Sequence, residues 1–542
     1  MSGSRRRLGF VVALAVCAVM CLGGAPDVGA QKGGTLVEAM GTEPTNLDIF
    51  KMARKAEYQV VHLMIEPLFV INAKMESEPL LVESYKVSDD QLSWTFKIKK
   101  GIKFHDGEPL DAAAVKYSFD RHKKSAAGQL LSIVSAIDVQ GTDTVVLKLE
   151  KPYPLLLTNL SSFSLGIVSP KAAESKEWGS KVIAGTGPLK LKQWISGDKV
   201  VLERNPEYRH APSFCVNKGP AYVDEYVLRF VPEPATLIAE LTEGNVDLSL
   251  YVSERDVAGV KAHAKTSLIT IDSTAAIYLA INCDSKNAPY NDPKVRQALA
   301  HAINKRAVLK AAYHDVGSLL YTPLSTGVIG YSKEAAELGK GLNDYDPDKA
   351  KRLLEEAGWK DTNKDGIREK DGQELDLVFM SFTMPRYKRA AEVVQPMLQE
   401  AGFKVKLEIL EAGDLYARIR AGSYDLISIA LVGSQGTAVD DMVLGYHSKN
   451  IGNILQWSYF SNPEVDKLID AARFEVDAEK RKKALNDAQN ELVKGTPVAP
   501  MVNAMEIFAY KKATVGGVEN YGKHPWAFNQ LDCYRGLELF KK

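Results

Sequence analysis

The chain has 542 residues, with 68 Lys and Arg side chains and 68 Asp and Glu side chains. Three arginines at positions 5–7 precede an apolar run over residues 8–22, and a small-residue site follows at residues 28–30. The run is shorter than the ~20 residues that a membrane-spanning helix needs. The pattern is typical of a secretory signal peptide. We expect residues 1–30 to be cleaved and the mature chain to begin at Gln31.

Two cysteines in this segment raise the alternative of a lipid anchor. Cys17 and Cys21 follow Val16 and Met20, which are large for the position before a lipidated cysteine. We therefore expect cleavage and release into the periplasm rather than lipid attachment.

The balance of charge argues against a nucleic-acid partner. Cleavage after Ala30 removes three arginines and Asp27, so 68 basic and 68 acidic side chains become 65 and 67. Phosphate binding needs a concentrated positive face, which a net charge near −2 does not indicate. The remaining 512 residues exceed the roughly 250–300 at which a single core stops growing, so two or three domains are expected.

Three cysteines remain after cleavage, namely Cys215, Cys283 and Cys533. In an oxidising compartment we expect one disulfide and one buried thiol, and all three pairings remain open. The chain has no Cys-x-x-Cys, no zinc-ligand spacing and no histidine pair at ligand spacing. We expect neither a metal nor a cofactor.

Strand patterns are spread along the chain. Leu92 begins LSWTFKIKKGIKF, in which apolar and polar residues alternate on both sides of Lys100-Gly101, as in a β-hairpin with one buried face. Similar alternation predicts strands over residues 144–149, 200–204, 226–230, 277–281, 375–379 and 404–410.

Helix starts share one signature. Asp292-Pro293, Asp346-Pro347 and Asn462-Pro463 each place a side-chain acceptor at the N-cap and a proline at the first helical position. The helix after Asp346 stops at Gly358, and PRYKRAAEVVQPMLQEAGF ends in the same way at Gly402. Helices and strands are interleaved, which predicts an α/β fold.

Three short motifs resemble functional sites but are better explained as turns. DTNKDGIREKDG (361–372) matches the start of a calcium loop, but Gly372 replaces the glutamate at position twelve, so we predict a hairpin. GTGPLKLKQW (185–194) lacks the third glycine of a dinucleotide cradle and leads into a strand. His105-Asp106-Gly107 precedes the N-cap Asp111, so we predict a turn, with general acid–base chemistry as the alternative.

Five segments in order resemble the family 5 extracellular solute-binding proteins, which include the dipeptide- and oligopeptide-binding proteins of ABC importers. The segments are WTFKIKKGIKFHDGEPLDAAAVKYSFDR, GTGPLKLKQWISGDKVVLERNPEY, NDPKVRQALAHAINK, YDPDKAKRLLEEAGW and YFSNPEVDKLID. The resemblance runs from about Gly34 to the C-terminus.

The resemblance implies a two-lobed α/β periplasmic binding protein of the Venus-flytrap type II, with an extra domain on lobe one. Lobe one would comprise residues 31–72, 186–284 and 509–542, the extra domain residues 73–185, and the other lobe residues 285–508. The chain would cross between the lobes near Cys283-Asp284 and near Phe508–Tyr510. The segment around His105 then lies in the extra domain, away from the cleft.

The resemblance also implies partners for the two ends of a peptide. An aspartate that holds the ammonium group matches Asp440 and Asp441 in SIALVGSQGTAVDDMVLGYHS, although the family's usual tryptophan and proline are absent. The carboxylate partner matches Arg386, Lys388 or Arg389 at the start of PRYKRAAEVVQ, with Arg389 or Lys388 best placed. Adjacent aspartates also mark helix N-termini, and basic residues in a first turn are often solvated.

Four further residues match positions along the family's cleft. Tyr278 and Asn282, in AIYLAIN, match the strand that follows the cleft, where a core role for Tyr278 is the alternative. Glu43 and Asn46, in GTEPTNLD, match the loop at the cleft mouth.

Together these features predict a monomeric periplasmic subunit of an ABC importer that binds peptides, has no catalytic activity and delivers its ligand to an inner-membrane permease. Nickel complexes, sugars and opine-like compounds are alternative ligands within the family. A secreted hydrolase with Asp440, Asp441 and His447 as its acid–base set is the alternative from another class. A chaperone-like binder of unfolded chains is a third possibility.

Overall fold

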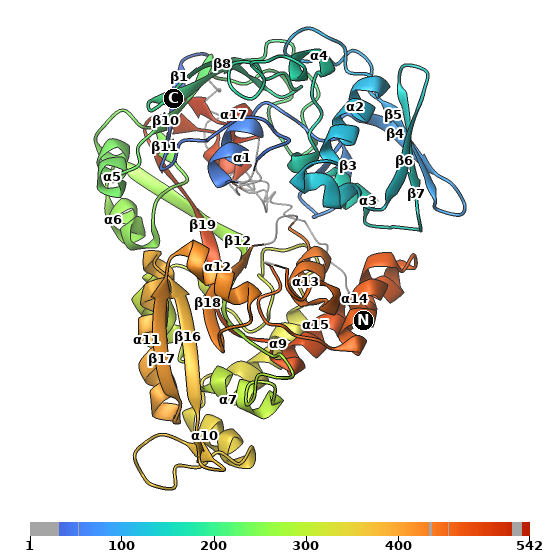
Figure 1. Cartoon of the computed structure of the whole chain (residues 1–542). Helices are drawn as coiled ribbons and strands as arrows, with labels where there is room; N and C mark the ends of the chain where they lie inside the picture. Colours follow the sequence, from blue (N-terminus) through green and yellow to red (C-terminus); the bar gives the residue numbers. More distant parts are fainter. Residues whose placement is uncertain (1–31, 53, 433–435, 454, 523–533) are drawn as a thin grey trace, which may run out of the picture.

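The computed structural model describes residues 32–52, 54–432, 436–453, 455–522 and 534–542. The predicted signal peptide and Cys533 lie outside these residues. Within the described part of the chain, no helix is long and apolar enough to span a membrane. Figure 1 shows two lobes, one above the other, joined by the long strands β12 (Thr266–Ile281) and β19 (Val498–Lys511).

One 11-stranded sheet runs through both lobes, in the order β17-β16-β18-β12-β19-β11-β1-β10-β9-β8, with β13 paired to β19. The antiparallel register of β12 and β19 shifts between Asp272 and Ala276. On one side of this shift β19 pairs with β11, and on the other side β12 pairs with β18. The two strands therefore pass from one lobe to the other within their own length.

The first lobe is built on the parallel pair of β1 and β10, which the antiparallel strands β9 and β8 extend. Its elements are β1 (Thr35–Met40), α1 (Lys55–Val61), β8 (Leu189–Ile195), β9 (Lys199–Arg204), β10 (Glu225–Phe230), α5 (Pro234–Thr242), β11 (Leu248–Ser249), η3 (Glu254–Asp256), α6 (Val257–Ala262), β20 (Val515–Gly516), α16 (Val518–Tyr521), α17 (Arg535–Glu538) and β21 (Phe540–Lys541).

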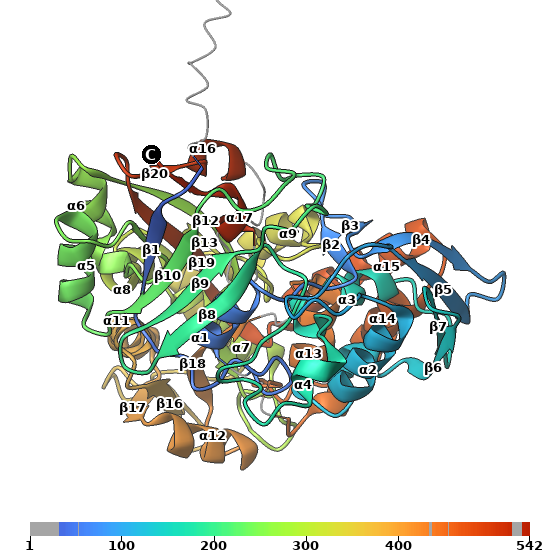
Figure 2. The same ribbon diagram turned by 90° about the horizontal axis from the view of Figure 1, so that it is seen from above.

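The extra domain has its own four-stranded antiparallel sheet, β4-β5-β7-β6, which lies to one side of the first-lobe strands (Figure 2). Its elements, with the small β2–β3 sheet that precedes them, are β2 (Phe69–Ile71), β3 (Ser77–Pro79), β4 (Val82–Val87), β5 (Ser93–Ile98), α2 (Ala112–His122), η1 (Ala126–Leu131), β6 (Val134–Gln140), β7 (Thr144–Leu149), α3 (Leu156–Leu160), η2 (Phe163–Leu165) and α4 (Pro170–Ala173). Phe96 and Phe119 share one buried cluster with Leu36 and Tyr226 of the first lobe. The extra domain therefore packs on lobe one, as expected.

The second lobe has a separate core, to which Phe379, Leu426 and Met501 belong. Its helices are α7 (Pro293–Ala302), α8 (Lys305–Tyr313), α9 (Lys333–Asn343), α10 (Pro347–Glu356), α11 (Pro385–Ala401), α12 (Ala412–Arg420), α13 (Ala438–Tyr446), η4 (Ser448–Asn450), α14 (Pro463–Phe474) and α15 (Ala478–Gly495). Its strands are β13 (Ser318–Leu319), β14 (Glu369–Lys370), β15 (Gln373–Glu374), β16 (Asp376–Phe382), β17 (Lys404–Leu410) and β18 (Leu426–Val432).

The buried clusters divide the chain inside β12 and β19 rather than at their ends. Residues 276–281 pack in the core of the second lobe, whereas Ile507 and Ala509 pack with Ala39 in the first lobe. The boundary expected at residue 284 placed the second half of β12 in lobe one, whereas the structure buries it in the core of the second lobe. We place the crossing at the register shift of β12, because each half of the strand buries its apolar side chains in a different core.

Local signals account for most helix ends. Asp292, Asp346 and Asn462 each accept a hydrogen bond from a backbone N–H of the first helical turn, as predicted. Gly358 and Gly402 follow α10 and α11 with φ of 92° and 105°, in the left-handed region that glycine adopts without strain.

The hairpin predicted around Lys100-Gly101 is wrong. β5 pairs with β4 and β7, and Lys103 forms an isolated bridge with Pro109. Alternation indicates that a segment is a half-buried strand, but it does not identify the strand's partner, because pairing depends on cross-strand contacts with other segments.

Candidate functional site between the lobes

A cavity of about 290 Å³ lies where β12 and β19 cross between the lobes. The first lobe contributes α1, the loop before η3 and the first residue of η3, the second lobe contributes the start of α11, and both crossing strands contribute lining residues. The lining residues are Lys55, Leu250, Tyr251, Val252, Ser253, Glu254, Ser273, Ala275, Arg386, Ala504, Met505, Glu506 and Ile507. Residues of both lobes therefore line this cavity.

Two ion pairs border the cavity. Lys55 Nζ lies 2.9 Å from Glu506 Oε2, and Arg386 Nη1 lies 3.7 Å from Glu254 Oε1. The Glu254–Arg386 pair joins the two lobes. Two cations and two anions in one small cavity suit a ligand that itself carries both charges.

Only one of the three basic residues predicted to bind a carboxylate lines this cavity, and it is Arg386. Lys388 lies 3.9 Å from Glu392 on the same helix, and Arg389 Nη1 lies 2.9 Å from His314 Nε2. The expected ranking, with Arg389 or Lys388 best placed, is therefore not supported. Arg386 stands in the first turn of α11 next to the crossing strands, whereas the other two contact α11 itself and the end of α8.

Asp440 and Asp441 lie in the first turn of α13. Asp440 N–H donates to Thr437 Oγ1 over 3.1 Å, and the Thr437 hydroxyl donates to Asp440 Oδ2 over 2.5 Å. Burial raises the pKa of Asp440, although the Thr437 hydrogen bond and the positive charge of Arg473 oppose this effect. Asp440 thus stabilises the N-terminus of α13, which is the role that the sequence left as the alternative to ligand binding.

Asp441 is 2% exposed, and its Oδ1 has no hydrogen-bond partner among the described residues. Burial, and then the negative charge of Asp440, hold the pKa of Asp441 well above its ordinary value. A buried carboxyl oxygen without a hydrogen-bond partner is costly. Asp441 is not among the residues that line the cavity at the crossing strands.

Tyr278 and Asn282 lie inside the second lobe rather than along an open cleft. Tyr278 is 1% exposed, and burial raises its pKa. The Asn282 amide donates to Gly422 O and Tyr424 O over 3.1 and 2.9 Å, while its Oδ1 accepts from Asp284 N–H over 3.1 Å. The expected ligand contact of Asn282 is not supported, because the backbone occupies both ends of its amide.

Glu43 and Asn46 are also engaged with the protein. Glu43 accepts from Trp194 Nε1 and from Gly197 N–H, each over 3.0 Å. Asn46 Oδ1 accepts from Asp48 N–H over 3.0 Å, as in an Asx turn. These contacts support a structural role for both side chains in the loop after β1.

His105 and Asp106 are structural, as predicted. His105 Nε2 lies 3.0 Å from Gly187 O, and Asp106 accepts from the Ser169 hydroxyl over 2.6 Å. Burial lowers the pKa of His105 to about 4. The pair connects the extra domain to the segment that enters β8.

The two glycine-rich motifs are structural as well. A Cβ at Gly185 would meet Met64 O at 2.2 Å, so this glycine allows close approach of two backbones rather than holding a phosphate. In the 361–372 segment, Asp361 accepts from Gly366 N–H over 3.1 Å, and β14 and β15 form the predicted hairpin. Within the described residues, no group of three or more potential metal ligands occurs.

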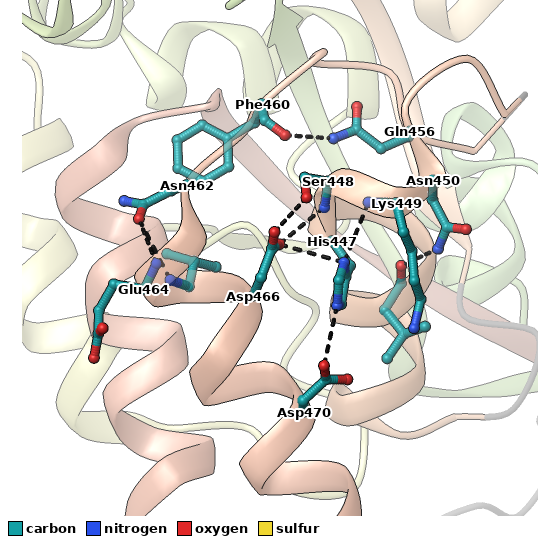
Figure 3. Close-up of polar contacts among 12 residues, drawn as sticks. His447, Ser448, Lys449, Asn450, Gln456, Phe460, Asn462, Glu464, Asp466 and Asp470 are labelled. Carbon is teal, nitrogen blue, oxygen red and sulfur yellow. Dashed lines mark hydrogen bonds and ion pairs between the residues drawn. The ribbon is translucent and has the colours of Figure 1, made fainter.

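The acid–base set of the hydrolase alternative does not assemble as expected. Figure 3 shows His447 between two aspartates of α14, with Nδ1 3.3 Å from Asp466 and Nε2 3.6 Å from Asp470. The neighbouring Ser448 hydroxyl donates to Asp466 rather than to the imidazole (Figure 3). A nucleophile needs a base within hydrogen-bond reach, and the Ser448 hydroxyl is bonded to a carboxylate instead. His447 and Ser448 therefore connect the end of α13 to α14 rather than forming a nucleophile–base pair.

Cys215 and Cys283 do not pair with each other. Cys215 is buried in the core of the first lobe, whereas Cys283 packs against the core of the second lobe. The pairings that involve Cys533 concern a residue outside the described part of the chain.

The sequence did not identify Lys55, Glu254 or Glu506 as site residues. They come from α1, from the start of η3 and from β19, which are far apart along the chain. Each is an ordinary charged residue in its own segment, so no local pattern distinguishes it.

A mixed sheet shared by two lobes, two crossing strands and a charged cavity beside them define a two-lobed ligand-binding protein. Residues 76–453 match the family described as Bacterial extracellular solute-binding proteins, family 5 Middle. The chain belongs to this family, whose members are transport binding proteins rather than enzymes.

Relatives and solved structures agree with this assignment over most of the chain. The oligopeptide-binding protein AppA of Bacillus subtilis is 27% identical over 479 residues, which cover 86% of each chain. The structure of AppA with a nonapeptide has a TM-score of 0.74 at 25% identity, covering 95% of this chain and all of that one. NikA of Brucella suis with Fe(III)-EDTA has a TM-score of 0.80 at 24% identity, covering 94% of this chain and all of that one, which shows the fold alone.

Proposed function

We propose that this protein is the periplasmic substrate-binding subunit of an ABC importer, and that it captures short peptides between its lobes for an inner-membrane permease. The observation that carries the proposal is the charged cavity at the crossing strands, which both lobes line. The oligopeptide-binding relative AppA supports a peptide as the ligand. We further propose that the protein acts as a monomer after cleavage of residues 1–30.

Closure supplies the mechanism. A ligand that contacts both lobes binds the closed state better than the open state, so it shifts the equilibrium toward closure by that difference in affinity. The permease then receives a protein of one defined shape. No covalent bond is made or broken, and the proposed activity is binding alone.

Opposite charges would hold the two ends of a peptide. Arg386 and Lys55 are the proposed partners of the terminal carboxylate, since both line the cavity. Asp441 is the proposed partner of the terminal ammonium, because its buried oxygen lacks a donor among the described residues. A cavity of about 290 Å³ is near the lower end of the range for small-molecule sites, which favours short peptides.

Native mass spectrometry of the protein purified from periplasm tests the ligand class. A co-purifying series of short peptides is the expected result, and calorimetry with tri-alanine then gives the affinity. If an ammonium group ionises Asp441, binding releases a proton, so the observed enthalpy depends on the buffer's enthalpy of ionisation. A co-purified metal complex, sugar or opine-like compound would refute the peptide proposal but not the family.

The same peptides test the absence of catalysis. We expect tri-alanine and a nonapeptide to be recovered intact after prolonged incubation with the protein. Shortened products that disappear in His447→Gln would support the hydrolase alternative instead.

A further inference from the structure

The extra domain contacts the second lobe at a site separate from the crossing strands. In Figure 1 α3 of the extra domain lies above α14 of the second lobe. Just before α3, the Tyr153 ring lies 5.9 Å from the ring of Phe474, the last residue of α14. Lys151 Nζ lies 3.3 Å from the centroid of the same Phe474 ring.

The contact is reciprocal. Phe474 packs against the buried cluster that the first lobe shares with the extra domain, and Tyr153 belongs to that cluster. In return, Leu155 packs against a small second-lobe cluster of Val439, Ala472 and Ala484. Each partner therefore removes an apolar side chain of the other from water.

Cations strengthen this contact. The Arg473 guanidinium lies 4.9 Å from the Phe474 ring and 5.7 Å from the Tyr153 ring, so each ring lies near a cation from the opposite side of the contact. A cation over an aromatic face is attracted to it, and more strongly when water is excluded. Burial, and then the nearby negative charge of Asp440, raise the pKa of Tyr153 to about 12.

The position of the contact determines when it can form. The second lobe is joined to the rest of the protein through β12 and β19, and residues 151–155 belong to the extra domain, which packs on the first lobe. Opening of the lobes about the crossing strands separates residues 151–155 from α14, whereas closure brings them together. The contact energy therefore favours the closed state whatever occupies the cavity.

We propose that Lys151, Tyr153, Arg473 and Phe474 form a closing contact that sets the affinity for every ligand by the same factor. The proposal rests on the proposed function as a two-lobed binding protein. Apparent affinity scales with the population of the closed state, so a residue that never touches the ligand changes the affinity for all ligands alike. These four side chains are thus affinity-determining residues outside the ligand site.

Two mild variants test the proposal. Phe474→Leu keeps apolar bulk but removes the ring, and Lys151→Ala alters an exposed side chain, so both are expected to fold. Lys148→Ala is the matched control, because Lys148 lies in the same domain, is 54% exposed and pairs with Asp138. Affinity is measured by calorimetry with tri-alanine and with a nonapeptide, and the radius of gyration of the ligand-free protein by small-angle X-ray scattering.

We expect Phe474→Leu and Lys151→Ala to weaken both peptides by one common factor of about three- to tenfold, with no change in the control. Unchanged affinities would overturn the proposal, as would losses that differ between the two peptides, which indicate direct ligand contact. If the wild type binds neither peptide, the proposed ligand class is wrong, and the closing contact is tested by the scattering measurement alone. In that case a larger radius of gyration in Phe474→Leu supports the closing contact, and an unchanged radius overturns it.

Discussion

The guanidinium of Arg386 and the carboxylate of Glu254 lie 3.7 Å apart, although one belongs to the second lobe and the other to the first. A ligand carboxylate that enters the cavity competes with Glu254 for Arg386. The Glu254–Arg386 pair is therefore both an inter-lobe contact and the proposed anchor of a peptide's C-terminus.

Replacement of this arginine tests that anchor. Arg386→Gln should weaken tri-alanine binding about 10- to 100-fold, since a charge-assisted hydrogen bond to the ligand is lost. Arg389→Gln is the matched control, because Arg389 contacts His314 rather than the cavity. Calorimetry on both variants checks the prediction, and a larger loss in Arg389→Gln would restore the ranking expected from the sequence.

The stability of the ligand-free protein should depend on pH through Asp441. Its folded pKa is raised above the unfolded value of about 4, so its stabilising contribution is complete below pH 4 and is lost as the pH rises toward the folded pKa. Each pH unit in that window lowers the free energy of unfolding by up to about 1.4 kcal/mol. Asp441→Asn should therefore become more stable than the wild type as the pH rises from 4 to 7.

Urea unfolding at pH 4, 5.5 and 7 measures this difference. The exposed Asp89→Asn variant serves as control, and its stability relative to the wild type should stay nearly constant. If the difference in the free energy of unfolding between Asp441→Asn and the wild type is also independent of pH, Asp441 is ionised in the folded protein and the prediction is wrong.

His105 should show the opposite dependence. Its folded pKa of about 4 lies below the unfolded value of about 6.5, so its contribution is present above pH 6.5 and is lost as the pH falls toward 4. His105→Gln should lower the free energy of unfolding by about 1–2 kcal/mol at pH 7, through loss of the contact with Gly187 O. The deficit should shrink toward pH 4.

Peptide affinity should be unchanged in His105→Gln, since the side chain lies between the extra domain and the start of β8. The exposed His314→Gln variant provides a control for stability. A loss of affinity at full stability would contradict the structural role of His105.

Gly185 should tolerate no side chain. Gly185→Ala places a Cβ 2.2 Å from Met64 O and 2.7 Å from Ile65 Cα, and both atoms belong to backbone that cannot move cheaply. We expect a loss of at least about 3 kcal/mol in the free energy of unfolding, or no soluble protein. Gly259→Ala in α6 meets nothing within 4 Å and should be neutral or stabilising by up to about 1 kcal/mol. Thermal unfolding compares them, and equal melting temperatures would contradict the close approach.

Several elements could be predicted from local sequence because their causes are local. Asp346 and Asn462 cap helices through atoms within three residues of themselves. The strands over residues 144–149 and 404–410 were predicted with the observed bounds, since alternation is a property of the segment itself. The resemblance of five segments to one family added the two-lobed arrangement, which no single segment indicates.

The candidate site was predicted only in part. Arg386 was among the expected residues, but Lys55, Glu254 and Glu506 were not. Glu43 instead accepts a hydrogen bond from Trp194, and Asn282 donates to backbone carbonyls. A charged side chain at a ligand site and one in a structural contact look alike in sequence, because the difference lies in the partner that folding brings near.

The amino-acid sequence by itself determined the α/β pattern, the helix caps and the family, because these depend on neighbouring residues or on ordered segments. The tertiary structure alone decided where β12 and β19 change lobes, which basic residue lines the cavity, and that Tyr153 meets Phe474. Those outcomes depend on contacts between segments separated by more than a hundred residues, and such contacts form only when two cores and their shared sheet pack together.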